Sequence, residues 1–241
     1  MQTQVFRRLS AAALALPLLA GCGGTDVNPF DPTRDAKLRL LHASSAPGGQ
    51  ADFLLAGVRA ARLDYGQPTN YLTVSAGTLA IGMQSLPDDD GNPILTFLAT
   101  SATITAGQFH TVVITGPEGN VAAVTATEGG PPAAGNVSLR VLHAGETTAA
   151  LDLYVTAPDA DLNAATPLVT GIDPREVTDY QVIGTATLQV RLTTTGTKTP
   201  LIASSPTTFA DRQVTTLFVV DHPTPGEPPV GFFLPDGGAL E

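Results

Sequence analysis

Apolar and polar residues alternate along several short segments of the chain. Over residues 78–83, Leu, Ile and Met alternate with Thr, Ala and Gly, and residues 187–192 repeat the pattern with Leu, Val and Leu. A period of two predicts strands with one buried and one exposed face. The runs 38–41 and 112–114 are more continuously apolar, as central strands of a sandwich can be.

Clusters of Gly, Pro, Asn and Asp separate these segments, for example at 47–49, 88–93 and 117–120. Such clusters are typical of turns between short strands. After the first 21 residues no stretch has a convincing helical period, and only 157–165 suits a single helical turn. We therefore predict an all-β fold of two tandem Ig-like antiparallel β-sandwich domains that follow a lipoprotein signal peptide.

The prediction of two domains comes from an internal repeat. Leu-Arg-Leu-Leu-His-Ala at 38–43 returns as Leu-Arg-Val-Leu-His-Ala at 139–144, and 51–55 matches 151–155. Each copy closes with an acidic residue and two glycines. The spacing of about 100 residues is too long for a solenoid unit and indicates tandem domains. The expected parts are a signal peptide (1–21), a lipid-anchored tether (22–35), a first sandwich (36–128), a linker (129–135) and a second sandwich (136–241).

The N-terminal residues have the order of an export signal. Arg7 and Arg8 precede an apolar stretch over 9–20, and small residues lead to Cys22. The run Leu-Ala-Gly-Cys is a bacterial lipobox, so we expect diacylglycerol on Cys22; an ordinary cleaved signal with an incidental cysteine is the alternative. The expected location is the cell membrane or the outer membrane, on the periplasmic or surface-facing side, and Gly23 favours the outer membrane.

Composition narrows the classes of function. Cys22 is the only cysteine, which excludes disulfides within the chain and thiolate metal centres. The net charge of −10 argues against nucleic-acid binding. The expected partners are membrane lipid, through Cys22, and envelope proteins or polysaccharide.

The repeated motif resembles a known family. A strand of the type Leu-Arg-Leu-Leu-His-Ala, a loop with Pro and a strand that carries Asp before alternating apolar residues are similar to the bacterial "domain of unknown function 4397" family. The resemblance covers about 36–128 and 136–238; members often have Tyr-Val in the later strand, as at 154–155, where the first copy has Leu-Leu at 54–55. It implies exported, often lipid-anchored β-sandwich domains in tandem, with no assigned activity.

His42 and Asp52, with their counterparts His143 and Asp152, are the most strongly repeated polar residues. If adjacent antiparallel strands bring each pair together, the carboxylate could orient the imidazole as a general base. Duplication in both copies favours a structural role instead, because a single active site rarely needs two copies. We keep all four as candidates for interaction.

Asp88 and Asp90 belong to the one acidic cluster of the chain, Asp-Asp-Asp-Gly-Asn at 88–92. Close carboxylates suit Ca²⁺, but the order of residues fails the EF-hand pattern and the second copy has no such run. A solvated hairpin loop is the favoured interpretation. We expect no cofactor, no bound metal and no catalytic residues, and we expect the protein not to be an enzyme.

Two functions fit these expectations. The first is a lipid-anchored envelope protein that acts as a non-catalytic binding or structural module through loops or strand edges. The alternative is a ligand-binding lipoprotein that holds a small molecule or a cation between its two domains. A concave interdomain cleft would favour the alternative.

Overall fold

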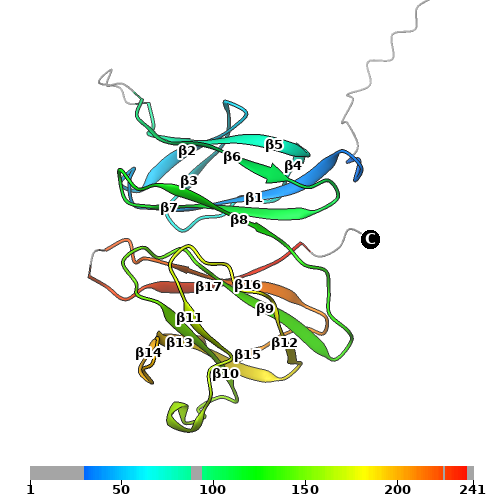
Figure 1. The fold of residues 1–241 in the computed structure, drawn as a ribbon, viewed down its shortest axis with the longest axis vertical. Coiled ribbons are helices and arrows are strands. Elements are labelled where there is room, and N and C mark those ends of the chain that lie inside the picture. Colours follow the sequence, from blue (N-terminus) through cyan, green and yellow to red (C-terminus); the bar gives the residue numbers. More distant parts are fainter. Residues whose placement is uncertain (1–29, 88–93, 225, 238–241) are drawn as a thin grey trace, which may run out of the picture.

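The structure is a computed structural model that describes residues 30–87, 94–224 and 226–237 (Figure 1). Strands dominate, and the only helix in these ranges is the single 3-10 turn η1 (Leu162–Ala164), which lies in the segment expected to hold one turn. The all-β prediction is confirmed. Within the described ranges, no helix is long and apolar enough to cross a membrane.

The strands form two sandwiches, each of two stacked sheets (Figure 1). The first sandwich has one sheet in the order β4 (Leu72–Ser75), β1 (Asp35–Ser44), β7 (Phe109–Gly116), β8 (Ala122–Thr127), and another in the order β3 (Val58–Asp64), β2 (Gln50–Leu55), β5 (Gly77–Gln84), β6 (Thr96–Ile104).

The second sandwich repeats this order. One sheet runs β12 (Gln181–Gly184), β9 (Asn136–His143), β16 (Val214–Val220), β17 (Val230–Pro235), and the other runs β11 (Val169–Ile172), β10 (Leu151–Thr156), β13 (Thr187–Thr194), β14 (Pro200–Ala203), with β15 (Thr207–Thr208) beside β13.

One pair of strands in each sandwich corrects the expectation of antiparallel sheets. β1 pairs with β7 in parallel, and β9 pairs with β16 in parallel, so one sheet of each sandwich is mixed. Both parallel and antiparallel strands alternate their side chains with a period of two, so the hydrophobic pattern does not reveal direction. The five strands between β1 and β7 supply the long connection that a parallel pair needs.

The strands with period two pack as predicted. Ile81 and Met83 of β5 lie in the core of the first sandwich, and Val190 and Leu192 of β13 lie in the core of the second. The other face of β5 is exposed or half-buried, whereas on the other face of β13 Arg191 and Thr193 are buried.

The continuously apolar strands are buried on both faces. On β1, Leu38 and Leu40 point into the first core, whereas Leu41 and Ala43 belong to a third core shared by the two sandwiches. The third core also holds Phe218 of β16. The sheets that contain β1 and β9 therefore pack against each other, and every residue of β7 and β16 is buried.

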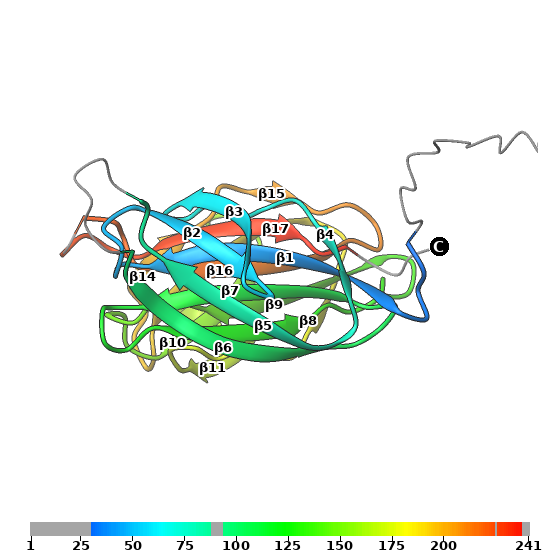
Figure 2. The same cartoon turned by 90° about the horizontal axis from the view of Figure 1, so that it is seen from above.

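Figure 2 shows which ends of the sandwiches lie together. β1 begins and β17 ends at one end of the molecule, and the turns that follow β1 and β16 lie at the opposite end. We call the first the proximal end, because the N-terminal part of the chain enters there, and the second the distal end.

Candidate functional site

The structure does not bring His42 and Asp52 together. β1 and β2 belong to different sheets, so they are not the adjacent antiparallel strands that the pairing required. Asp52 instead accepts two hydrogen bonds from Arg62, at 2.7 and 2.9 Å, and these bonds together with the guanidinium charge lower its pKa. His42 packs edge-on against Phe53.

His143 and Asp152 are likewise separate. The carboxylate of Asp152 accepts the backbone N–H groups of Gly171 and Gly196, each at 2.9 Å. Nδ1 of His143 lies 3.1 Å from the carbonyl oxygen of Ile172. The aspartates of both copies thus hold neighbouring strands and turns, and neither copy contains the His-carboxylate pair that a general base would use.

Burial sets the protonation of both histidines. Both side chains are fully buried, and Nε2 of each has no hydrogen-bond partner. Desolvation lowers the pKa of His42 to about 4 and also lowers the pKa of His143. Both imidazoles are therefore neutral at neutral pH.

Three of the expected site residues lie outside the described residues. They are Cys22, Asp88 and Asp90. Among the residues that the structure does describe, no group of three or more His, Cys, Asp or Glu side chains could hold a metal ion.

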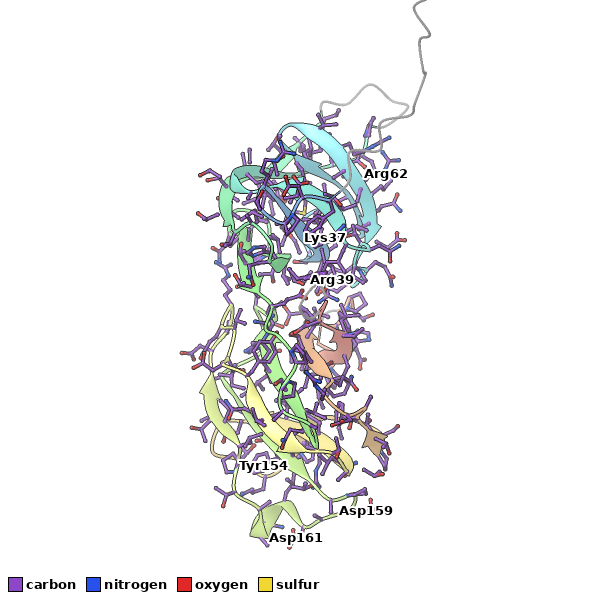
Figure 3. All side chains as sticks on the ribbon, turned by 90° about the vertical axis from the view of Figure 1, so that its right-hand side faces the viewer. Lys37, Arg39, Arg62, Tyr154, Asp159 and Asp161 are labelled. Carbon is purple, nitrogen blue, oxygen red and sulfur yellow. The ribbon has the colours of Figure 1, made fainter. Side chains whose placement is uncertain are left out.

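The arginines of the repeated motif form a polar network that the sequence analysis missed. Arg39 on β1 and Arg140 on β9 are each 4% exposed and lie between the two sandwiches. Figure 3 shows Arg39 at this junction, whereas Arg62 lies toward the outer side of the first sandwich. Arginine is rarely buried this deeply without partners for its charge.

The partners of Arg39 come from both copies. Its guanidinium donates to Oγ1 of Thr111 at 3.0 Å and to Oε1 of Glu128 at 3.3 Å, both in the first copy. It also donates to the carbonyl oxygen of Pro235 at 2.9 Å and to Oδ1 of Asp236 at 3.2 Å, both in the second copy.

Arg140 makes the corresponding contacts from the second copy, with the roles of the two copies exchanged. It donates to Oγ1 of Thr216 at 2.9 Å in its own copy and to the carbonyl oxygen of Thr127, next to Glu128, at 2.8 Å in the other copy. Its ion pair with Asp236 is longer, at 3.7 Å. Such reciprocal contacts are those of a two-fold interface, here formed within one chain.

Two tyrosines complete the network. Tyr71 donates to Glu128 and lies under the guanidinium of Arg39 at 4.9 Å, and Tyr180 donates to Asp236 and lies under Arg140 at 4.4 Å. Burial raises the pKa of both tyrosines, so both hydroxyls keep their hydrogens. These residues stand at equivalent positions of the two copies.

The glycines that follow Glu128 and Asp236 also form hydrogen bonds between the two copies. The N–H of Gly237 donates to Oε2 of Glu128 at 2.6 Å, and the N–H of Gly129 donates to the hydroxyl of Tyr180 at 3.2 Å. A Cβ on Gly237 would lie 2.1 Å from Cδ1 of Phe109. The repeated sequence of an acid and glycine is therefore a requirement of the interface.

A cleft opens between the copies at the distal end. It has a volume of about 680 Å³ and is lined by the turn after β1, the turn after β9 and the turn after β16. Tyr65 of the first copy forms part of its wall and donates a hydrogen bond to the carbonyl oxygen of Asp221 at 2.8 Å. This volume is within the range of small-molecule sites.

The fold and the site define an all-β protein of two sandwiches joined by a buried polar network. Residues 36–154, just under half of the chain, match the model of the family described as "Domain of unknown function (DUF4397)". The match runs from β1 to β10, so the resemblance inferred from the repeated motif is confirmed over the first copy and the start of the second. No curated protein matches the chain.

Among solved structures, the chain is similar to a Bacteroides fragilis protein described as a candidate cell adhesion protein. The two are 11% identical, and the alignment covers 82% of this chain and 87% of the other, with a TM-score of 0.22. This likeness is too distant to carry an argument about function.

Proposed function

We propose that the chain is a lipid-anchored, non-catalytic module of the cell envelope that presents its distal end to a partner. The observation that carries the proposal is the union of the two sandwiches into one body by a shared core and a buried network. A body joined in this way, entered by the chain at one end, holds the turns of its other end at a fixed distance from the point where the chain enters.

The contacts of the repeated polar residues support a non-catalytic role. The motif arginines, the acids and the aspartates are occupied in binding their own chain, as the bond lengths above indicate. The turns of the distal end differ between the two copies, since nine residues connect β16 to β17 and only five connect β7 to β8. Binding residues are often found on loops that a rigid scaffold positions.

The test is capture of partners from gently crosslinked envelope. Wild type is expected in the membrane fraction with an acylated N-terminal peptide, and Cys22→Ala in the soluble envelope fraction. Thr147→Arg, at the distal end, is expected to lose the captured partner. Val182→Arg, on an edge strand away from that end and 62% exposed, is the matched control and is expected to retain it. Equal capture by both variants would refute presentation of the distal end.

The cleft favours a second candidate function, the binding of a small ligand between the two copies. A purely structural spacer would not need a cleft of this volume with walls from both copies. The two candidates are compatible, because the cleft opens at the end that the first candidate presents.

A further inference from the structure

The two copies differ at two positions beside the cleft. The parallel registers of β1 with β7 and of β9 with β16 place Gly145 where the first copy has Ser44, and Asp221 where the first copy has Gly116. In the first copy the hydroxyl of Ser44 donates to the carbonyl oxygen of Gly116 at 2.6 Å, which closes this position. The second copy has a carboxylate here instead.

The histidines before these positions carry their hydrogens on opposite nitrogens. Nδ1 of His143 faces the carbonyl oxygen of Ile172, and because a carbonyl only accepts, Nδ1 is the protonated nitrogen. Nε2 of His143 is therefore a bare acceptor, fully buried and without a partner. In the first copy, Nδ1 of His42 accepts the backbone N–H of Ser44 at 3.3 Å, so its Nε2 carries the hydrogen.

Three polar atoms gather around Gly145. A Cβ on this glycine would lie 3.1 Å from Oδ1 of Asp221, 3.3 Å from Nε2 of His143 and 3.3 Å from Oγ1 of Thr148. Asp221 and Thr148 line the cleft, whereas Gly145 and the fully buried His143 lie behind them, so a ligand in the cleft approaches this group past these two side chains. An unpartnered acceptor beside a carboxylate and a hydroxyl oxygen matches a ligand that supplies several N–H or O–H donors at once.

The charge of the cleft indicates which kind of hydrogen-bond donor it attracts. Asp221 and Glu227 line it, and no Lys or Arg is among its lining residues in the part of the chain that the structure describes. The groups that bind Asp221 are neutral, namely the backbone N–H groups of Glu146 and Thr147 and the hydroxyls of Thr147 and Thr148, so its charge is not cancelled. A negative cleft attracts cations and repels anions.

We propose that the cleft binds a primary ammonium group, which donates to Nε2 of His143 and to the carboxylate of Asp221. The source of the ammonium is either a free amine or the side chain of a lysine on a partner. This inference rests on the second candidate function above and names its ligand. The first copy, with Ser44 and Gly116 in these positions, has no such site.

The test uses the full-length chain in detergent, with 1,5-diaminopentane as the probe and its fully N-methylated analogue as the control. The analogue has the same charge and no N–H donor. Calorimetry is expected to show saturable binding of the diamine and binding of the analogue weaker by about tenfold or more, because the charge-assisted hydrogen bonds are lost. The ¹⁵N signal of Nε2 of His143 is expected to shift on binding, and that of His42 to stay unchanged.

Two variants locate the site. Gly145→Ala crowds the three polar atoms without removing any of them and is expected to weaken binding by about tenfold; Gly184→Ala, where a Cβ meets nothing within 4 Å, is the matched control. Asp221→Asn removes the charge and is expected to weaken binding similarly. If the turn that Asp221 holds unfolds in that variant, Glu227→Gln tests the charge instead.

Replacement of the diamine by a lysine-containing peptide and its Nε-acetylated form distinguishes the two sources of the ammonium. Equal binding of the methylated analogue, binding unchanged in Gly145→Ala, or no binding of either amine would overturn the proposal. Capture of a partner that depends on Thr147 would still support the envelope module, so the two failures are distinguishable.

Discussion

Replacement of Arg39 by Met is the sharpest test of how the two copies are held together. The change preserves much of the side-chain length but removes four hydrogen bonds, two within the first copy and two that join it to the second. It leaves Glu128 and Asp236, whose side chains are fully buried, without this cation. Loss of one member of a buried ion pair costs about 3–5 kcal/mol.

The remaining partners place the expected loss at the lower end of that range. Glu128 keeps the hydroxyls of Tyr71 and Thr111 and the N–H of Gly237. Asp236 keeps the hydroxyls of Tyr180 and Thr216 and its longer ion pair with Arg140. We therefore expect Arg39→Met to lower the free energy of unfolding by about 3 kcal/mol.

Two further variants make the prediction specific. Arg140→Met removes only two hydrogen bonds and an ion pair of 3.7 Å, since one of its nitrogens has no hydrogen-bond partner, and is expected to cost about 2 kcal/mol. Arg59→Met breaks an ion pair at 3.5 Å in which the arginine is 57% exposed, and is expected to cost less than about 1 kcal/mol.

The assay is urea unfolding on the Cys22→Ala background, followed by circular dichroism and tyrosine fluorescence. Urea is uncharged and does not screen the ion pairs as guanidinium would. The two signals are expected to coincide in wild type, because the sandwiches share a core. A loss below about 1 kcal/mol for Arg39→Met, or a loss equal to that of Arg59→Met, would refute the reasoning.

Three further predictions concern Gly237, His42 and Asp152. Gly237→Ala places a Cβ against Phe109 and is expected to cost about 1–3 kcal/mol in urea unfolding, whereas Gly130→Ala, which meets nothing within 4 Å, is expected to cost little. Because the pKa of His42 is lowered to about 4, unfolding takes up a proton between pH 6.5 and 4, so stability is expected to fall over that range as pH falls, and His42→Gln to flatten the decline. Asp152→Ala leaves two backbone N–H groups without an acceptor and is expected to lower the melting temperature, with Asp152→Asn intermediate; unchanged melting would contradict this role.

The fold class follows from the sequence because alternation and turn residues report burial and chain reversal directly. The strands 78–83 and 187–192 pack on the predicted faces for this reason. The parallel pairing of β1 with β7 does not follow, because the period of side chains is the same in both directions. Which sheet a strand joins is decided by contacts distant in sequence.

The same limit explains why the sequence left open whether His and Asp pair. His42 and Asp52 are ten residues apart and on successive strands, but those strands lie in different sheets. A better signal was present at Arg39, an arginine inside an apolar strand that recurs in the second copy. A charged residue that is retained in a strand buried on both faces must have a partner, and the acid that closes each copy is that partner.

The reciprocal interface has a consequence for how the protein behaves at low abundance. Two separate chains that met through such a face would come apart on dilution, since their pairing would depend on concentration. Here the linker 129–135 makes the pairing intramolecular, with an effective concentration of the order of millimolar. Each half is thus free to diverge at its distal end, as Gly145 and Asp221 have, while a single gene keeps the ratio of the halves at one to one.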